Sequence, residues 1–114
     1  MPLQQKKIKR LKGRDRITAI FDKGEYLHTP PLGVRFQKDT TTTGVYVGVS
    51  VSKKRFPKAV DRNTIKRKLR ACLATTQKLE TLPAGAYMFL FLGTTHHDLE
   101  NVQAALNQLV KKLG

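Results

Sequence analysis

The segment 44–52 constrains the fold most, because its residues alternate strictly. Valines stand at positions 45, 47, 49 and 51, and the positions between them hold Tyr46, Gly48 and Ser50. A period of two residues places alternate side chains on opposite faces of a sheet, so we predict a strand with one apolar face. On its other face Gly48 and the two serines leave room for something to approach closely.

The next segment, residues 53–70, is strongly basic. Nine of its eighteen residues are Lys or Arg, and Asp61 is the only acid. Charges this dense repel one another unless a polyanion neutralises them. Arg62, Lys66 and Arg70 recur every four residues, which places them on one face of a helix. A helix with an apolar face opposite is ordered, unlike a basic tail, and its natural ligand is a nucleic-acid backbone. The apolar face is predicted to consist of Val60, Ile65, Leu69, Cys72 and Leu73.

The basic helix is expected to run to about Thr75, with Pro57 in its first turn, where a missing N–H is not needed. After a turn at 83–85, the apolar run 86–92 predicts a strand buried on both faces. Two strands that flank one helix of this length indicate a crossover with some parallel pairing. The usual handedness rule would make that crossover right-handed.

The remaining segments complete one small α/β domain over residues 13–114. A helix is expected from Gly13 to Gly24, and a half-buried strand over 32–37, reached through a turn or extended connection at 28–31. A last helix is expected after Asp98, which could cap it. The order is helix, strand, strand, basic helix, strand, helix. Residues 1–12 form a basic tail that we expect to be mobile without its ligand.

The charge balance narrows the class of partner. The 114 residues carry 22 Lys and Arg against 8 Asp and Glu, a net charge of +14. Such a balance favours nucleic acid over an anionic membrane surface. The single cysteine, Cys72, excludes an internal disulfide and is read as a small core residue. The longest apolar run is too short to cross a bilayer, and no apolar signal segment follows the basic start, so we expect a cytoplasmic protein.

A protein active site is not evident. His96 and His97 are adjacent, and adjacent histidines rarely chelate one ion, so no metal site is predicted. The glycines match neither common nucleotide-binding loop, and no paired carboxylates or nucleophile arrangement can be argued from spacing. For Phe21, core packing is weighed against base stacking; for Arg35, solvent exposure against a nucleic-acid contact. Asn63 is a poor interior helix residue, which suggests a polar role for its side chain.

These residues resemble the protein subunit of bacterial ribonuclease P. That family has a strand ending in Ser-Lys-Lys, a short turn, and then Ala-Val-x-Arg-Asn-Arg-x-Lys-Arg-x-x-Arg. Here residues 47–54 and 59–70 carry that pattern, and residues 10–11 and 20–24 are similar to the family's first helix. Two departures stand out. Thr64 replaces the second arginine of Arg-Asn-Arg, and the turn 55–58 is basic and slightly longer than the usual one.

The resemblance implies a fold and a role. The fold would be a two-layer α/β sandwich with a left-handed βαβ crossover around the basic helix. The role would be that of cofactor to a large catalytic RNA, which removes the 5′ leader from precursor tRNA by magnesium-dependent endonucleolytic hydrolysis. The protein would bind this RNA and the leader, without an organic cofactor, a membrane or an obligate protein partner. Magnesium would be held mainly by the RNA and the substrate.

The resemblance also implies site residues. The RNA-binding surface would consist of Lys53, Lys54, Arg55, Lys58, Arg62, Asn63, Lys66, Arg67 and Arg70. Phe21, Arg35 and Ser52 would line the leader cleft. Two alternatives remain open: a general RNA-binding protein, such as a ribosomal protein or RNA chaperone, and a protein nuclease with its own carboxylates. The first explains the charge equally well, but not the ordered match.

Overall fold

The computed structural model describes residues 8–11, 14–38, 44–76, 82–94 and 100–113. Five strands and three helices follow in the order β1 (Ile8–Arg10), α1 (Arg14–Lys23), β2 (Glu25–Thr29), β3 (Leu32–Lys38), β4 (Val45–Val51), α2 (Ala59–Thr75), β5 (Gly85–Phe91) and α3 (Val102–Leu113). The six predicted elements all occur, in the predicted order, and the α/β class is confirmed. The strands β1 and β2 were not predicted.

One sheet joins all the strands, in the order β1-β4-β5-β3-β2. The strands β4 and β5, which flank α2 in the chain, pair directly and in parallel, as the crossover predicted. The short β1 is parallel to β4, whereas β3 is antiparallel to both β5 and β2. The left-handed sense of the β4–α2–β5 crossover stays a prediction.

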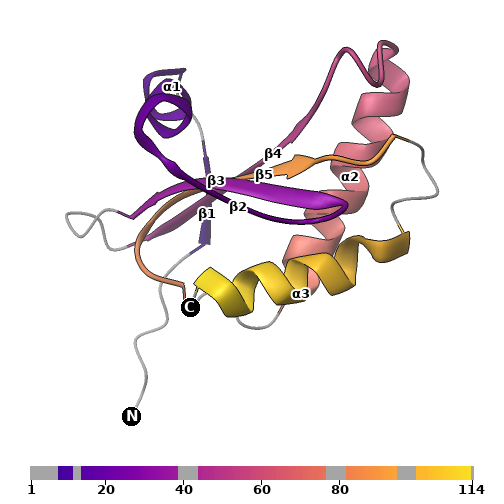
Figure 1. Ribbon diagram of the computed structural model, residues 1–114. Coiled ribbons are helices and arrows are strands. Elements are labelled where there is room, and N and C mark those ends of the chain that lie inside the picture. The colour runs from indigo at the N-terminus through magenta and orange to yellow at the C-terminus, as the bar shows by residue number, and fades with distance from the viewer. Residues whose placement is uncertain (1–7, 12–13, 39–43, 77–81, 95–99, 114) are drawn as a thin grey trace.

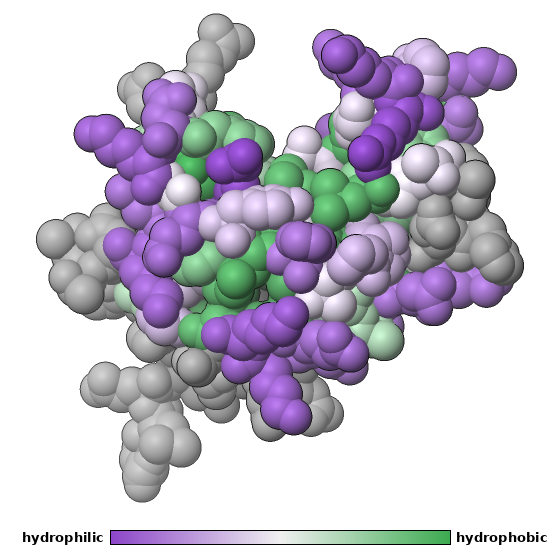
Figure 2. Space-filling view, viewed as in Figure 1, coloured by the Kyte–Doolittle hydropathy of each residue, from purple (hydrophilic) through white to green (hydrophobic). Residues whose placement is uncertain are grey.

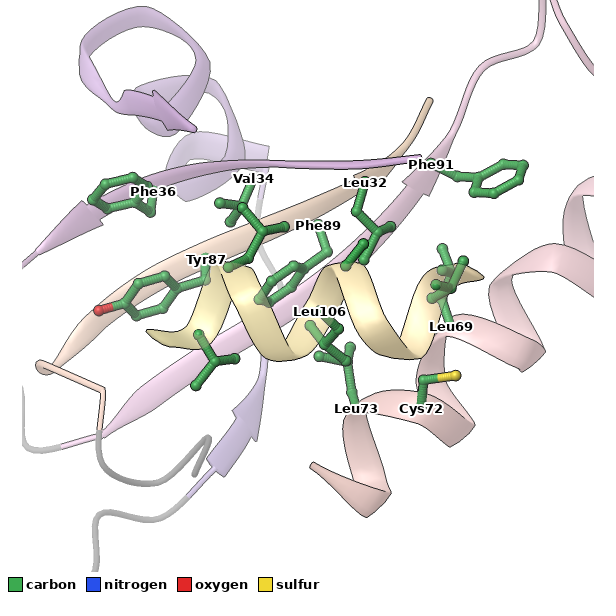
Figure 3. Packing of buried hydrophobic residues seen from close by; sticks show 14 of the residues in the cluster. Leu32, Val34, Phe36, Leu69, Cys72, Leu73, Tyr87, Phe89, Phe91 and Leu106 are labelled. Carbon is green, nitrogen blue, oxygen red and sulfur yellow. The ribbon is translucent and has the colours of Figure 1, made fainter. Parts of the chain in front are cut away.

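The helices cover the sheet unequally (Figure 1). The larger core lies on the side of α2 and α3, where alternate residues of β3 and β5 meet Leu69 and Leu106 (Figure 3). A smaller cluster lies on the other side, where Ile20 of α1 packs with Leu11 and Met88. The predicted two-layer sandwich therefore describes the sheet with α2 and α3, and α1 adds a partial layer on the opposite face.

Several local predictions are confirmed. The valines of β4 face the larger core, with Val45 and Val51 buried and the two between them packed against it. Cys72 is buried in the same cluster. The helix α1 ends where Gly24 was expected to stop it, and the Gly24 N–H donates to the carbonyl of Ile20 at 2.8 Å. Among the described residues, no helix has the length and hydropathy needed to cross a membrane.

Other predictions need correction. The segment 28–31 is not merely a connection, because its first two residues end β2. The tail predicted over residues 1–12 contains β1, and Leu11 donates from its N–H to the carbonyl of Val47 at 2.7 Å. Leu11 and Met88 also fill the space beside Gly48, so the chain itself makes the close approach that the small residue allows. The predicted cap Asp98 lies outside the described residues.

The start of α2 corrects two further predictions. The helix begins at Ala59, with Lys58 at its N-cap, so Pro57 precedes the first turn. Val60 is 75% exposed and does not belong to the apolar face. The reason is geometric: five residues separate Val60 from the buried Ile65, which places the two side chains about 140° apart around the helix.

Tyr87 yields a prediction about pH. Its ring is fully buried, its hydroxyl donates to the carbonyl of Pro83 at 2.6 Å, and burial raises the pKa of Tyr87 from 10.0 to about 12. Because the folded pKa exceeds the unfolded one, this stabilisation is present below pH 10 and is lost as pH rises through about 12. The free energy of unfolding of the native chain should therefore fall, relative to Tyr87→Phe, across that window. Urea unfolding of both proteins at several pH values tests this, and a difference independent of pH would contradict it.

Candidate nucleic-acid interface

The cations of α2 are presented on a helix that the core holds firmly. Ile65, Leu69, Cys72 and Leu73 bury one side of α2 against the sheet and α3. Arg67 and Arg70 are exposed, as is Asn63, while Arg62 and Lys66 lie partly buried at the margin of the helix. The helix therefore presents exposed cations on the side away from the sheet, whereas two members of the predicted stripe, Arg62 and Lys66, lie at the margin of the apolar face and not opposite it. The exposed Val60 lies on this same surface, where the sequence reasoning had not placed it.

The loop 52–58 carries the other predicted cations and is held by hydrogen bonds within its own turn. The Ser52 hydroxyl accepts hydrogen bonds from the backbone N–H groups of Lys54 and Arg55, at 3.2 and 3.4 Å. The N–H of Phe56 donates to the Ser52 carbonyl at 3.0 Å, and its ring is buried 5.9 Å from that of Phe91. The loop is thus anchored in the core at its middle. It leaves Lys53, Lys54, Arg55 and Lys58 exposed.

Two arginines brace this loop as well as carrying charge. The Arg62 Nη1 donates to the carbonyls of Phe56 and Pro57, at 2.9 and 2.8 Å. Arg55 donates from its guanidinium to the carbonyl of Leu92, just beyond the end of β5. Both were predicted only as RNA contacts. The Arg55 bond joins residues 37 positions apart, and the Arg62 bonds, although they span only five and six positions, depend on how the loop turns back on the helix, so no sequence pattern predicted them.

The bracing by Arg62 has a measurable consequence. Hydrogen bonds from a charged donor contribute about 1.5–3 kcal/mol each when buried, and less at a margin such as this one. Arg62→Met keeps the aliphatic stem but leaves the two carbonyls without this donor, so we expect the free energy of unfolding to fall by about 1–2 kcal/mol. Urea denaturation of the free protein measures the change. Arg67→Met, at an exposed position with no bond to the loop, is the matched control and should change stability by less than about 0.5 kcal/mol. Equal effects in both variants would contradict the bracing role.

A hollow separates α1 from the loop that precedes α2. In Figure 2 it has hydrophilic side chains on both flanks and hydrophobic ones along its floor. The pairing of the strands places Ser50, Leu90 and Gly33 side by side on the face of the sheet between these flanks. This part of the sheet has no helix over it, in contrast to the face beneath, which α2 and α3 cover (Figure 1).

The three predicted cleft residues occupy different flanks of this hollow. Phe21 of α1 is 41% exposed and is not part of the buried core. The guanidinium carbon of Arg35 lies 5.5 Å from the centre of the Phe21 ring, so these two form one cluster. Ser52 does not join them. Arg35 of β3 pairs with Met88 of β5, which in turn pairs with Gly48 of β4. Ser52 follows Gly48 by four residues, so it lies two strands away from Arg35 and about 13 Å further along the strand direction.

The cluster has one further member that was not predicted from the sequence. Tyr26 of β2 pairs with Arg35 across the strands, and the Arg35 guanidinium carbon lies 5.2 Å from the centre of its ring. A cation this close to an aromatic face is held by the ring's electrostatic field. An exposed aromatic residue beside a strand was the available signal, but β2 itself was not predicted. The result is an arginine over two aromatic side chains at the edge of the hollow.

No group of three or more metal-ligating side chains occurs among the described residues. The pair His96 and His97 lies outside that part of the chain. The interface therefore consists of cations, exposed aromatic rings and backbone groups. Such an arrangement can bind and orient a flexible polyanion, with stacking surfaces for its bases.

The fold and this surface define a small basic α/β protein in which nine of the 22 Lys and Arg residues lie on one helix and the loop before it. The Ribonuclease P family matches residues 5–114, so the chain belongs to that family. A comparison with curated protein sequences finds no match.

Solved structures of ribonuclease P proteins share the fold. A Staphylococcus aureus RNase P protein mutant with defective mRNA degradation activity is 24% identical, with a TM-score of 0.73, over 90% of this chain and 86% of that one. The RNase P protein from Thermotoga maritima is 23% identical, with a TM-score of 0.71, over 93% of this chain and 98% of that one. At these identities the likeness establishes the fold alone.

Proposed function

We propose that this chain binds the catalytic RNA of ribonuclease P through α2 and the loop before it, and holds the 5′ leader of precursor tRNA in the hollow beside α1. The observation that supports this most directly is the division of the surface. Exposed cations lie on α2 and its loop, whereas Phe21, Arg35 and Tyr26 gather on the other flank of the hollow.

The two flanks suit different parts of an RNA substrate. Structured RNA is bound mainly through phosphates and shape, which fits a helix carrying cations in fixed register. A single-stranded leader has unstacked bases, which fits exposed rings and a nearby cation. In the reaction that we propose, the RNA carries out the hydrolysis and holds the magnesium ions together with the substrate. The cations of the protein reduce phosphate repulsion near the cleavage site and so favour occupancy of those ion sites.

Cleavage of a precursor tRNA at low magnesium tests this function. A bacterial ribonuclease P RNA is assayed with and without the protein, and the 5′ end of the product is mapped. We expect the protein to stimulate cleavage at the mature 5′ end, and the stimulation to shrink as magnesium is raised. Tight RNA binding without stimulation, repeated with the RNA from the same source as the protein, would favour a general RNA-binding role instead. Cleavage by the protein alone would indicate a protein nuclease.

A further inference from the structure

The edge strand β2 carries an aromatic pair, Tyr26 and His28, of which the proposed function uses only Tyr26, through its contact with Arg35. Its residues alternate between the two faces of the sheet. Leu27 packs against the larger core, and Thr29 accepts a hydrogen bond from the Lys112 ammonium of α3 at 3.1 Å. Tyr26 and His28 therefore point to the opposite face, on the side of the hollow. Tyr26 is 41% exposed and His28 is exposed as well.

The Tyr26 ring is held against the sheet. Gly33 of β3 has no side chain there, and a Cβ at that position would lie 2.7 Å from the Tyr26 hydroxyl oxygen and 3.1 Å from its Cε1. The ring of Tyr26 is thus accommodated by a glycine, close to the backbone of the neighbouring strand. His28 stacks beside it, with ring centres 5.7 Å apart and planes inclined by 18°.

These contacts make a continuous row of flat groups across the sheet. It starts at Phe21, passes through the Arg35 guanidinium to Tyr26 on the edge strand, and continues along that strand to His28. Rings whose orientation is already restrained lose little entropy when a base stacks on them. The charge of Arg35 within the row favours a ligand that is anionic as well as flat. The neighbouring acid Glu25 belongs to the face of Leu27, by the alternation of the strand.

We propose that the stacked pair of Tyr26 and His28 extends base stacking beyond Phe21 and Arg35, along the edge strand, and takes further unpaired nucleotides of the same leader. This inference rests on the proposed function, since it identifies how much of the leader the protein contacts. Stacking tolerates any base, because every base has a flat aromatic face. The site should therefore make affinity depend on leader length more than on leader sequence.

The test measures binding of precursor tRNAs to the complete RNA–protein complex. Leaders of about two, five and ten nucleotides are compared with mature tRNA, a range that spans common single-strand site sizes. We expect Tyr26→Ala and His28→Ala each to weaken binding of the longest leader about fivefold and to leave the shortest almost unchanged. Tyr26→Phe, which keeps the ring, should bind like the native protein. Thr29→Ala, on the same strand but the other face, should show the native dependence on leader length.

Two further binding measurements distinguish base stacking from electrostatic attraction as the cause of the leader-length dependence. Gly33→Ala keeps both rings but displaces Tyr26, so it should reproduce part of the loss. Abasic nucleotides in the distal leader should remove the native advantage of a long leader, whereas a purely electrostatic contact would retain it. Equal losses at every leader length, or no loss in either alanine variant, would overturn the inference. If the native complex itself binds leader-containing and mature tRNA equally, the proposed leader contact fails as a whole, and this result is distinct from the failure of Tyr26 and His28 alone.

Discussion

Replacing Arg62 and Arg67 together with alanine is expected to weaken binding of the ribonuclease P RNA at least about tenfold. Arg67 is exposed on the outer side of α2, and Arg62 lies at its margin beside the cationic loop. Each phosphate contact that is lost also removes the release of condensed counterions. The dependence of log affinity on log salt should therefore flatten by about one for each contact, or about two for the pair.

The measurement is RNA binding over a series of salt concentrations. Lys111→Ala combined with Lys112→Ala is the matched control, because it also lowers the net charge from +14 to +12 but on α3. We expect this control to retain most of the affinity and nearly the native slope. Equal losses in both double variants would point to net charge alone, and unchanged affinity and slope would exclude α2 as the RNA surface.

The double variant has one structural side effect that must be separated from binding. Arg62 also donates to the carbonyls of Phe56 and Pro57, so its loss can loosen the loop that carries Lys53, Lys54 and Lys58. Arg67→Ala alone leaves those bonds intact. If Arg62→Ala weakens RNA binding more than Arg67→Ala does, the excess reports the ordering of the loop. Unfolding measured on the free proteins provides the independent check.

The sequence predicted the central elements well because their patterns are local. The alternation over 45–51 and the apolar spacing from Ile65 to Leu73 depend on neighbours only two to four residues away. The missed strands lack such patterns. The strand β1 has three residues, and β2 has five with a single core side chain, Leu27. The strand β1 is formed by pairing with β4, which is remote in sequence, whereas β2 pairs with the neighbouring β3 across a two-residue turn. The prediction that Val60 belongs to the apolar face was wrong because it considered the apolar side chain but not its angular position around the helix.

The same distinction applies to the site. Positions on α2 could be predicted because a cation every three or four residues has a defined place on a helix. The bonds of Arg55 and Arg62 to backbone carbonyls could not be predicted, because they depend on how the loop folds back over the sheet. The row through Arg35 and Tyr26 depends on the pairing of β2 with β3, and on Gly33 leaving room for a ring. A resemblance supplies positions, but the chain's own packing decides what each side chain contacts.

Phe21→Ala is expected to reduce the preference for precursor over mature tRNA about tenfold. Phe21 is 41% exposed, so its outer surface is available to a base, while Arg35 lies over the ring. Base stacking on an aromatic side chain contributes about 1–3 kcal/mol, and the loss of the ring also removes a partner that restrains the Arg35 guanidinium. Both effects act on the leader, which mature tRNA lacks.

The measurement is the affinity of the complete RNA–protein complex for each tRNA, expressed as a ratio. Phe21→Tyr is the matched control, since it keeps an aromatic face and should retain most of the preference. The free energy of unfolding of Phe21→Ala should fall by less than the roughly 3–5 kcal/mol typical of a fully buried phenylalanine, because part of the ring is already in solvent. A large loss of stability with equal weakening of both tRNAs would make Phe21 a packing residue. A ratio that falls while affinity for mature tRNA stays constant would place the leader beside α1.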